Sequence, residues 1–159
     1  MKGVRKIATT GIWKIEKRLD NVIDYTTNIE KTINSDYGKD SYYDLHNVID
    51  YVEADYKTEK QFYVSGVNCN PKTALEEMTI TKEQYGKTGG ILGFHAFQSF
   101  AEGEVTPEQC HAIGVRLAEE MWGDRFEVVV STHLNTNHYH NHFVINSVSF
   151  KDAKRYYDK

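Results

Sequence analysis

The alternation of apolar and polar residues predicts both strands and helices in this chain. Runs rich in β-branched and aromatic residues predict strands at 11–17, 61–67, 90–100, 125–133 and 140–150. Apolar residues at helical spacing predict helices at 18–32, 71–86 and 106–123. Strands and helices in this mixed order predict the α+β class, with a mainly antiparallel sheet flanked by helices.

The ends of these elements carry recognisable signals. Thr106 is the expected N-cap of the third helix, Pro107 occupies its first position, and Gly123 ends it. The last two strands are joined by the Asn-rich "LNTN", which favours a hairpin. The polar, tyrosine-rich stretch 33–60, with a weakly helical portion at 45–52, is the expected long excursion from the core.

Length, composition and charge narrow the protein's class. A chain of 159 residues forms one domain, and its ending "KDAKRYYDK" lacks a terminator, so we expect an N-terminal fragment of a longer protein. Without a long apolar run or a signal peptide, we expect no membrane insertion and a cytoplasmic location. Cys69 and Cys110 lie outside any CxxC, so the sequence suggests neither a disulfide framework nor a thiolate zinc site. The net charge of -4 argues against bulk coating of DNA, but residues 1–18 carry six basic residues and one acidic residue, which could hold a phosphate backbone locally.

The segment "HLNTNHYHNHFVIN", residues 133–146, holds four of the seven histidines. On a strand, His140 and His142 project from the same face at chelating spacing, and His133 at the end of the preceding strand can add a third nitrogen. Three protein ligands leave positions open on a metal, which is typical of a catalytic site. A four-residue loop would place His138 opposite His133, so geometry alone leaves His138 and His142 as alternatives. Imidazoles accept Zn, Mn, Co or Ni.

Three stretches together resemble the motifs of one family. "VIDYTTNIEKT" (22–32), "HAFQSFAEGEVTPEQCHAIG" (95–114) and "HLNTNHYHNHFVIN" (133–146) are similar, in this order, to the motifs of relaxase domains of conjugative and mobilizable elements. The nearest resemblance is to the MOBP-type branch of the histidine-hydrophobe-histidine endonuclease superfamily. The resemblance implies metal histidines on central strands and a nucleophilic tyrosine on a helix facing them.

The resemblance also assigns roles to individual residues. It implies that Tyr25 is the nucleophile and that His133, His140 and His142 hold Mg or Mn. Asn135 stands where many relatives have an aspartate, and its amide cannot accept a proton as that acid would.

Other polar and aromatic residues have less specific interpretations. Candidates for contacts with DNA phosphates or with the metal ligands are Lys31, Thr32, Ser99, Asn135, His138 and Asn146. Trp13 and Phe97 could stack bases, although packing is the preferred interpretation, and His95 and His111 are assigned to packing.

The resemblance implies a conjugative relaxase of a plasmid or conjugative transposon. Such an enzyme nicks one strand at an origin of transfer, becomes joined to the 5′ end through a phosphotyrosine, and later rejoins the ends. Its partners would be single-stranded DNA, accessory relaxosome proteins and a coupling protein, and we expect a monomer. The alternatives are a replication-initiator nuclease of the same superfamily, a noncatalytic metal- or DNA-binding module, and a hydrolytic metalloenzyme.

Overall fold

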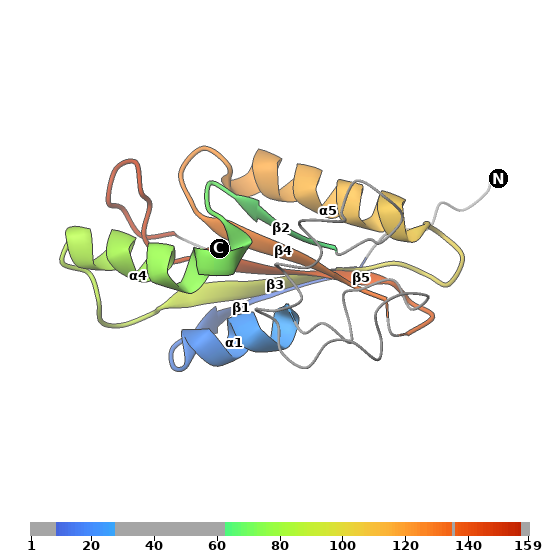
Figure 1. The fold of residues 1–159 in the computed structure, drawn as a ribbon, viewed down its shortest axis with the longest axis horizontal. Coiled ribbons are helices and arrows are strands. Elements are labelled where there is room, and N and C mark those ends of the chain that lie inside the picture. The colour runs from blue at the N-terminus through green and yellow to red at the C-terminus, as the bar shows by residue number, and fades with distance from the viewer. Residues whose placement is uncertain (1–8, 28–62, 135, 157–159) are drawn as a thin grey trace.

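A five-stranded antiparallel sheet forms the centre of the molecule (Figure 1). The computed structural model describes residues 9–27, 63–134 and 136–156. The strands are β1 (Thr9–Ile15), β2 (Val64–Val67), β3 (Gly93–Ser99), β4 (Val128–His133) and β5 (His140–Asn146), in the spatial order β1-β3-β5-β4-β2. All four neighbouring pairs are antiparallel. The predicted α+β class is confirmed; the predicted excursion 33–60 lies outside the described residues.

Helices cover both faces of the sheet. Helix α5 (Pro107–Trp122) packs on one face, whereas α1 (Leu19–Thr26) and α4 (Ala74–Gln84) pack on the other (Figure 1). The predicted cap of α5 is confirmed, because the Thr106 hydroxyl accepts a hydrogen bond from the Gln109 backbone N–H at 3.1 Å. The predicted start at Pro71 instead forms a short 3₁₀ turn, η1 (Pro71–Thr73), and α4 begins after it.

The two central strands are buried on both faces. Val128, Val130, Phe143 and Ile145 pack toward α5, while Val129 and Val144 pack toward α1 and α4. Successive strand residues point to opposite faces, so uninterrupted apolar runs such as "VVV" and "FVI" suit this double burial. Two packed layers therefore hold β4 and β5, the strands that carry the histidine motif.

Helix α1 is shorter than predicted. It ends at Thr26. The hydroxyls of Thr26 and Thr27 both donate to the Ile23 carbonyl, at 3.2 and 2.7 Å. Such side-chain to backbone bonds compete with continuation of a helix. Leu19, Ile23 and Thr26 are buried against the sheet, so the end of α1 is held over β4 and β5.

The hairpin between β4 and β5 differs from the predicted four-residue loop. His133 pairs with His140 in the antiparallel register, so the loop runs from Leu134 to Tyr139. Two bonds stabilise this longer loop: the Phe100 N–H donates to the Tyr139 carbonyl at 3.0 Å, and the Thr136 hydroxyl donates to the His138 carbonyl at 2.9 Å. The expectation that His138 lies opposite His133 is therefore wrong.

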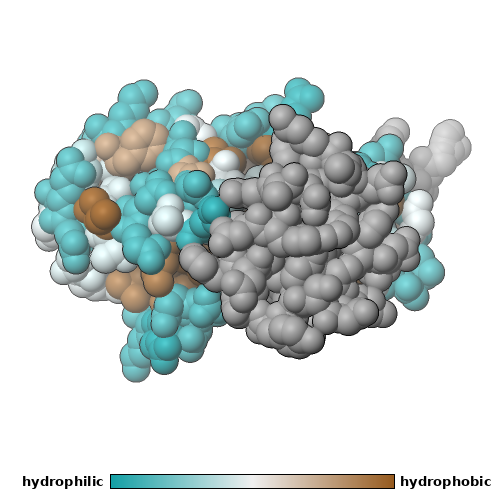
Figure 2. Space-filling view, viewed as in Figure 1, coloured by the Kyte–Doolittle hydropathy of each residue, from teal (hydrophilic) through white to brown (hydrophobic). Residues whose placement is uncertain are grey.

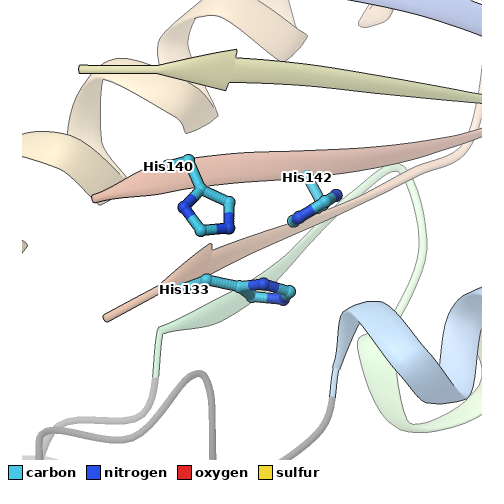
Figure 3. Close-up of side chains that lie close together, drawn as sticks. All are labelled: His133, His140 and His142. Carbon is cyan, nitrogen blue, oxygen red and sulfur yellow. The ribbon is translucent and has the colours of Figure 1, made fainter. Parts of the chain in front are cut away.

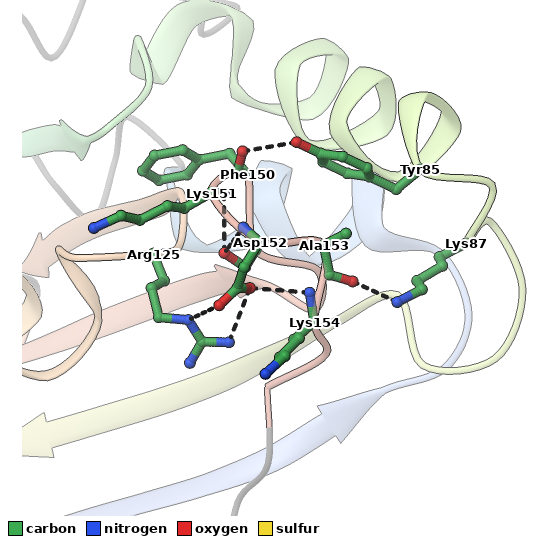
Figure 4. A network of polar contacts seen from close by, with 9 residues as sticks. Tyr85, Lys87, Arg125, Phe150, Lys151, Asp152, Ala153 and Lys154 are labelled. Carbon is green, nitrogen blue, oxygen red and sulfur yellow. Dashed lines mark hydrogen bonds and ion pairs between the residues drawn. The ribbon is translucent and has the colours of Figure 1, made fainter.

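The strand predicted at 140–150 ends early, at Asn146. The chain then turns, because the Ser149 hydroxyl accepts bonds from the backbone N–H groups of Lys151 and Asp152. Figure 4 shows how this C-terminal segment is tied down: Arg125 binds Asp152 through two nitrogens at 3.1 and 3.2 Å, and Tyr85 and Lys87 bind carbonyls of the segment.

A row of buried and partly buried hydrogen bonds crosses the sheet on the α5 face. It joins Gln98 of β3, Asn141 of β5, Thr132 of β4, His111 of α5 and Ser65 of β2, with distances of 2.5 to 3.0 Å. Asn141 also donates to the Cys110 carbonyl at 2.8 Å. Because Asn141 lies between His140 and His142 and Thr132 precedes His133, this row fixes the backbone that presents all three histidines on the other face. The assignment of His111 to packing agrees with this contact.

Acid should weaken the fold through His111. Burial lowers the pKa of His111 to about 4, and the hydroxyls of Ser65 and Thr132 and the ring of Tyr63 are its neighbours. Between pH 6.5 and 4, His111 therefore binds a proton in the unfolded chain but not in the folded protein. The stability that neutral His111 contributes is complete above pH 6.5 and is lost as pH falls. We expect His111 to account for a fall of about 2 kcal/mol in the free energy of unfolding between pH 7 and 5. Chemical denaturation at both pH values checks this, and His111→Gln should show a smaller fall; an equal fall in both proteins would contradict it.

The described part of the surface in Figure 2 is mainly hydrophilic, with separate apolar patches. In that part of the chain, no helix has the length and apolar character required to cross a membrane.

Candidate metal centre and nucleophile

Three imidazoles converge at one end of the central hairpin. One ring nitrogen from each of His133, His140 and His142 lies within 4.8 Å of the others. Figure 3 shows that His133 comes from β4 and that both other rings come from β5 and face the same space. The ring centroids are 4.2 to 5.1 Å apart. His133 is buried and the other two are half-buried, so the cluster remains open on one side.

Each ring is oriented by a bond to a group outside the trio. His133 Nε2 contacts the Thr26 carbonyl at 2.7 Å, His140 Nδ1 contacts the His138 carbonyl at 2.9 Å, and His142 Nδ1 contacts His95 Nε2 at 2.6 Å. A histidine that binds a metal through one nitrogen commonly uses its other nitrogen in this way, which fixes both the tautomer and the ring orientation.

The donor set fits a divalent cation with open coordination positions. Neutral imidazoles are ligands for first-row transition metals, and three of them leave room for oxygen ligands. The fully buried Ser131 hydroxyl is one of three buried side-chain polar atoms without a hydrogen-bond partner among the described residues, and it lies directly across from His142 in the strand register. An unsatisfied buried hydroxyl is a feature that a further ion or water would explain.

Tyr25 lies beside this cluster, on the last turn of α1. Its ring centroid is 5.9 Å from that of His133 and 6.0 Å from that of His142, and the side chain is 52% exposed. Carbonyls of the last helical turn have no partner within the helix, so the Thr26 carbonyl can contact His133. This contact joins the end of α1 to β4. The same contact thus places the phenol next to the imidazoles.

The remaining predicted site residues are distributed differently. Ser99 is half-buried and pairs with His140 across β3 and β5, which places it beside the cluster. His138 is exposed in the hairpin loop, with its Nδ1 3.2 Å from the Phe100 carbonyl, and is not part of the trio. Lys31, Thr32 and Asn135 lie outside the described residues.

Asn146 supports the packing of α4. It is fully buried; its amide nitrogen donates to Glu127 at 2.9 Å and to the Met78 carbonyl, and its oxygen accepts from Lys82 at 2.6 Å. Burial lowers the pKa of Lys82 to about 8 and raises the pKa of Glu127. With its side chain enclosed in this way, Asn146 has no access to DNA, so the suggested DNA contact is not supported.

His95 belongs to the site although the sequence pattern favours packing for it. Its Nε2 lies 2.6 Å from His142 Nδ1, and burial lowers its pKa. Strand parity places His95, Phe97 and Ser99 on one face, but only the pairing of β3 with β5 shows that this face carries His142.

Removal of the His95 imidazole should weaken metal binding. We expect His95→Ala to lower the affinity for Mn²⁺ by about 10- to 100-fold, because loss of a group that orients a ligand has effects of this size. Titration calorimetry measures the affinity, and His95→Gln, which retains a hydrogen-bonding group, should recover part of it. An unchanged affinity in His95→Ala, with the fold intact, would show that His95 only fills space.

Comparison with known proteins decides the family. Residues 51–159 match the model of the MobA/VirD2-like relaxase nuclease domain. The chain belongs to the relaxase family. Protein rlx of Staphylococcus aureus is 46% identical over 92 residues, which cover 58% of this relaxase chain and 29% of that protein. Group II intron-interrupted relaxase LtrB of Lactococcus lactis subsp. cremoris is 31% identical over 166 residues, covering 88% of this chain and 29% of that protein. No solved structure matches significantly.

The family match covers part of the site of this relaxase. It includes the three clustered histidines, His95 and Ser99, whereas Tyr25 lies before its first residue. The position of Tyr25 beside the trio is thus an observation independent of that match. The chain also spans less than a third of the length of these relatives.

Proposed function

We propose that this relaxase domain cleaves one DNA strand by attack of Tyr25 on a phosphodiester held at the histidine trio. The observation that supports this most strongly is the position of the phenol, whose ring lies about as close to His133 as to His142. A nucleophile and a cluster of metal-binding groups side by side are the two parts that phosphoryl transfer requires.

The bonds exchanged in this step balance without a further reactant. The Tyr25 oxygen forms a bond to phosphorus, the bond from phosphorus to the 3′ oxygen breaks, and the departing oxygen gains a proton while the phenol loses one. The product is a 5′-phosphotyrosine and a free 3′-hydroxyl. Attack by a 3′-hydroxyl on the phosphotyrosine reverses the exchange and rejoins a strand.

His133, His140 and His142 would hold the divalent cation, with Mg or Mn proposed and Zn, Co or Ni compatible with the donors. Such an ion would neutralise charge on a nonbridging phosphate oxygen and favour the phenolate form of the nucleophile. The chain itself orients the groups: the His95 imidazole and the backbone carbonyls of Thr26 and His138 fix the three rings, and the bond from His133 to α1 keeps Tyr25 at the cluster. Ser99, beside His140, would contact a phosphate oxygen.

The family supports a proposal for the wider role. We propose that residues 1–159 form one DNA-nicking domain, monomeric and cytoplasmic, that acts at an origin of transfer of a mobile element. Accessory relaxosome proteins and a coupling protein would act on the full-length relaxase.

The direct test is a cleavage assay with labelled single-stranded oligonucleotides from candidate origins, with Mn²⁺ or Mg²⁺ present. We expect a protein-linked labelled band on denaturing electrophoresis when the label lies on the 3′ side of the cut. Release of free 5′-phosphate would indicate hydrolysis, and binding without cleavage at any candidate origin would indicate a noncatalytic module; either result would contradict the proposal.

A further inference from the structure

An aromatic surface continues from the histidine trio toward the β1 edge of the sheet. In the antiparallel register Trp13 pairs with His95, and Phe97 pairs with His142, so all four side chains share the face of the trio. The Trp13 ring lies 5.0 Å from that of His95 and 5.7 Å from that of Phe97, and His95 in turn lies 4.9 Å from His142.

Trp13 is the exposed member of this group. Its side chain is 49% exposed, whereas the other tryptophan, Trp122, is 3% exposed. The sequence favoured packing for Trp13, and the structure places it at the surface instead. A half-exposed indole gains less hydrophobic stabilisation than a buried one. Exposed aromatic side chains beside a polar site commonly serve as contact surfaces.

Gly11 gives the two rings their position. A Cβ atom at this residue would lie 2.6 Å from the Phe97 ring and 3.4 Å from the Trp13 ring. The Phe97 ring therefore lies across the backbone of β1, and any larger residue at this position would displace it. The arrangement depends on a residue without a side chain at the centre of the aromatic surface.

Basic residues lie close to Trp13 in the chain, although the whole protein carries a net charge of -4. Lys14, which alternates to the other face of β1, and Lys17, just beyond the strand, are both exposed, and the exposed Glu16 lies between them. Flat aromatic rings stack on bases whatever the sequence, and basic groups nearby hold the backbone, which is the usual combination in proteins that bind single strands.

We propose that Trp13, supported by Phe97, stacks a base of the single strand close to the phosphate held at the histidine trio. This inference rests on the proposed function, because it identifies how the same site holds its substrate. Stacking on Trp13 fixes one nucleotide against the sheet. The Trp13 ring contacts His95, and His95 contacts His142, so these contacts set the position of that nucleotide relative to the metal ligands. Trp13 would thus determine which phosphate reaches Tyr25.

Binding measured without divalent metal separates this proposal from cleavage. With a mixed-sequence single-stranded oligonucleotide in the presence of EDTA, we expect Trp13→Ala to weaken binding by about 5- to 100-fold, the range of one lost base stack. Trp13→Phe should retain most of the affinity, and Trp13→Leu should lose it. The matched control is Ile80→Ala on α4, which removes another exposed apolar side chain (58% exposed) and should leave binding unchanged.

Two further readouts identify stacking itself. The oligonucleotide should quench the exposed Trp13 fluorescence, and this quenching should be absent from Trp13→Phe, in which only Trp122 remains. A second readout uses a series of oligonucleotides from an origin sequence, each of which lacks a different single base. Removal of the base that stacks on Trp13 should weaken binding by the wild type but should not weaken binding by Trp13→Ala any further. Binding of Trp13→Ala within twofold of the wild type, no quenching, or equal losses throughout the series would each overturn the proposal. These outcomes are independent of whether Tyr25 forms a covalent product.

Discussion

Tyr25→Phe should abolish strand cleavage while the protein still folds and binds single-stranded DNA. The substitution removes only the oxygen that would attack phosphorus, and the ring keeps its contacts beside His133 and His142. Loss of a covalent nucleophile commonly reduces the rate by several orders of magnitude, so we expect a fall of at least about 10³-fold. The measurement is the amount of protein-linked labelled DNA on a denaturing gel.

Tyr139→Phe is the matched control for this change. Tyr139 lies in the hairpin loop directly before His140, so it too is a tyrosine close to the cluster. Full cleavage by Tyr139→Phe together with none by Tyr25→Phe would locate the reaction on α1. Undiminished cleavage by Tyr25→Phe would show that another tyrosine or a water molecule is the nucleophile.

His140→Ala should remove metal binding and cleavage together. It deletes one of three clustered nitrogens, so the loss of Mn²⁺ affinity should exceed the roughly 10- to 100-fold effect of losing a group that only orients a ligand. His140 is a better choice than His133, which is fully buried and also holds the end of α1, so that its removal would weaken the fold as well. Calorimetric titration with Mn²⁺ and the gel assay measure the two effects.

His138→Ala provides the comparison within the same motif. His138 lies two residues before His140 but is exposed in the loop and outside the trio. We expect its alanine variant to retain wild-type metal affinity. If His138→Ala lost the metal and His142→Ala kept it, the sequence alternative in which His138 replaces His142 would be correct and the geometry described above would not be the metal site.

The sequence predicted those features that depend on local pattern. Alternation along one strand was sufficient to place His140 and His142 on the same face, and capping residues were sufficient to define the start of α5. The α+β class followed from the order of the elements. These features arise from neighbouring residues, so one sequence carries the information.

Features that depend on distant contacts were beyond the sequence. The hairpin register is set partly by Phe100, the residue after β3, whose backbone N–H donates to the Tyr139 carbonyl and extends the pairing into the loop. The contact of His95 with His142 exists only because β3 lies next to β5. Exposure of Trp13 likewise reflects its place on an edge strand, which hydrophobicity alone does not report.

The most direct test of the whole account is mass spectrometry of the protein after incubation with its origin oligonucleotide and Mn²⁺. The chain contains eleven tyrosines, and cleavage after lysine and arginine leaves Tyr25 as the single tyrosine of its peptide, residues 19–31. We predict that the added nucleotide mass is found on the peptide containing Tyr25, at that residue, and disappears when the three histidines cannot bind metal. A nucleotide attached to a different tyrosine, or cleaved DNA with every tyrosine unmodified, would contradict it.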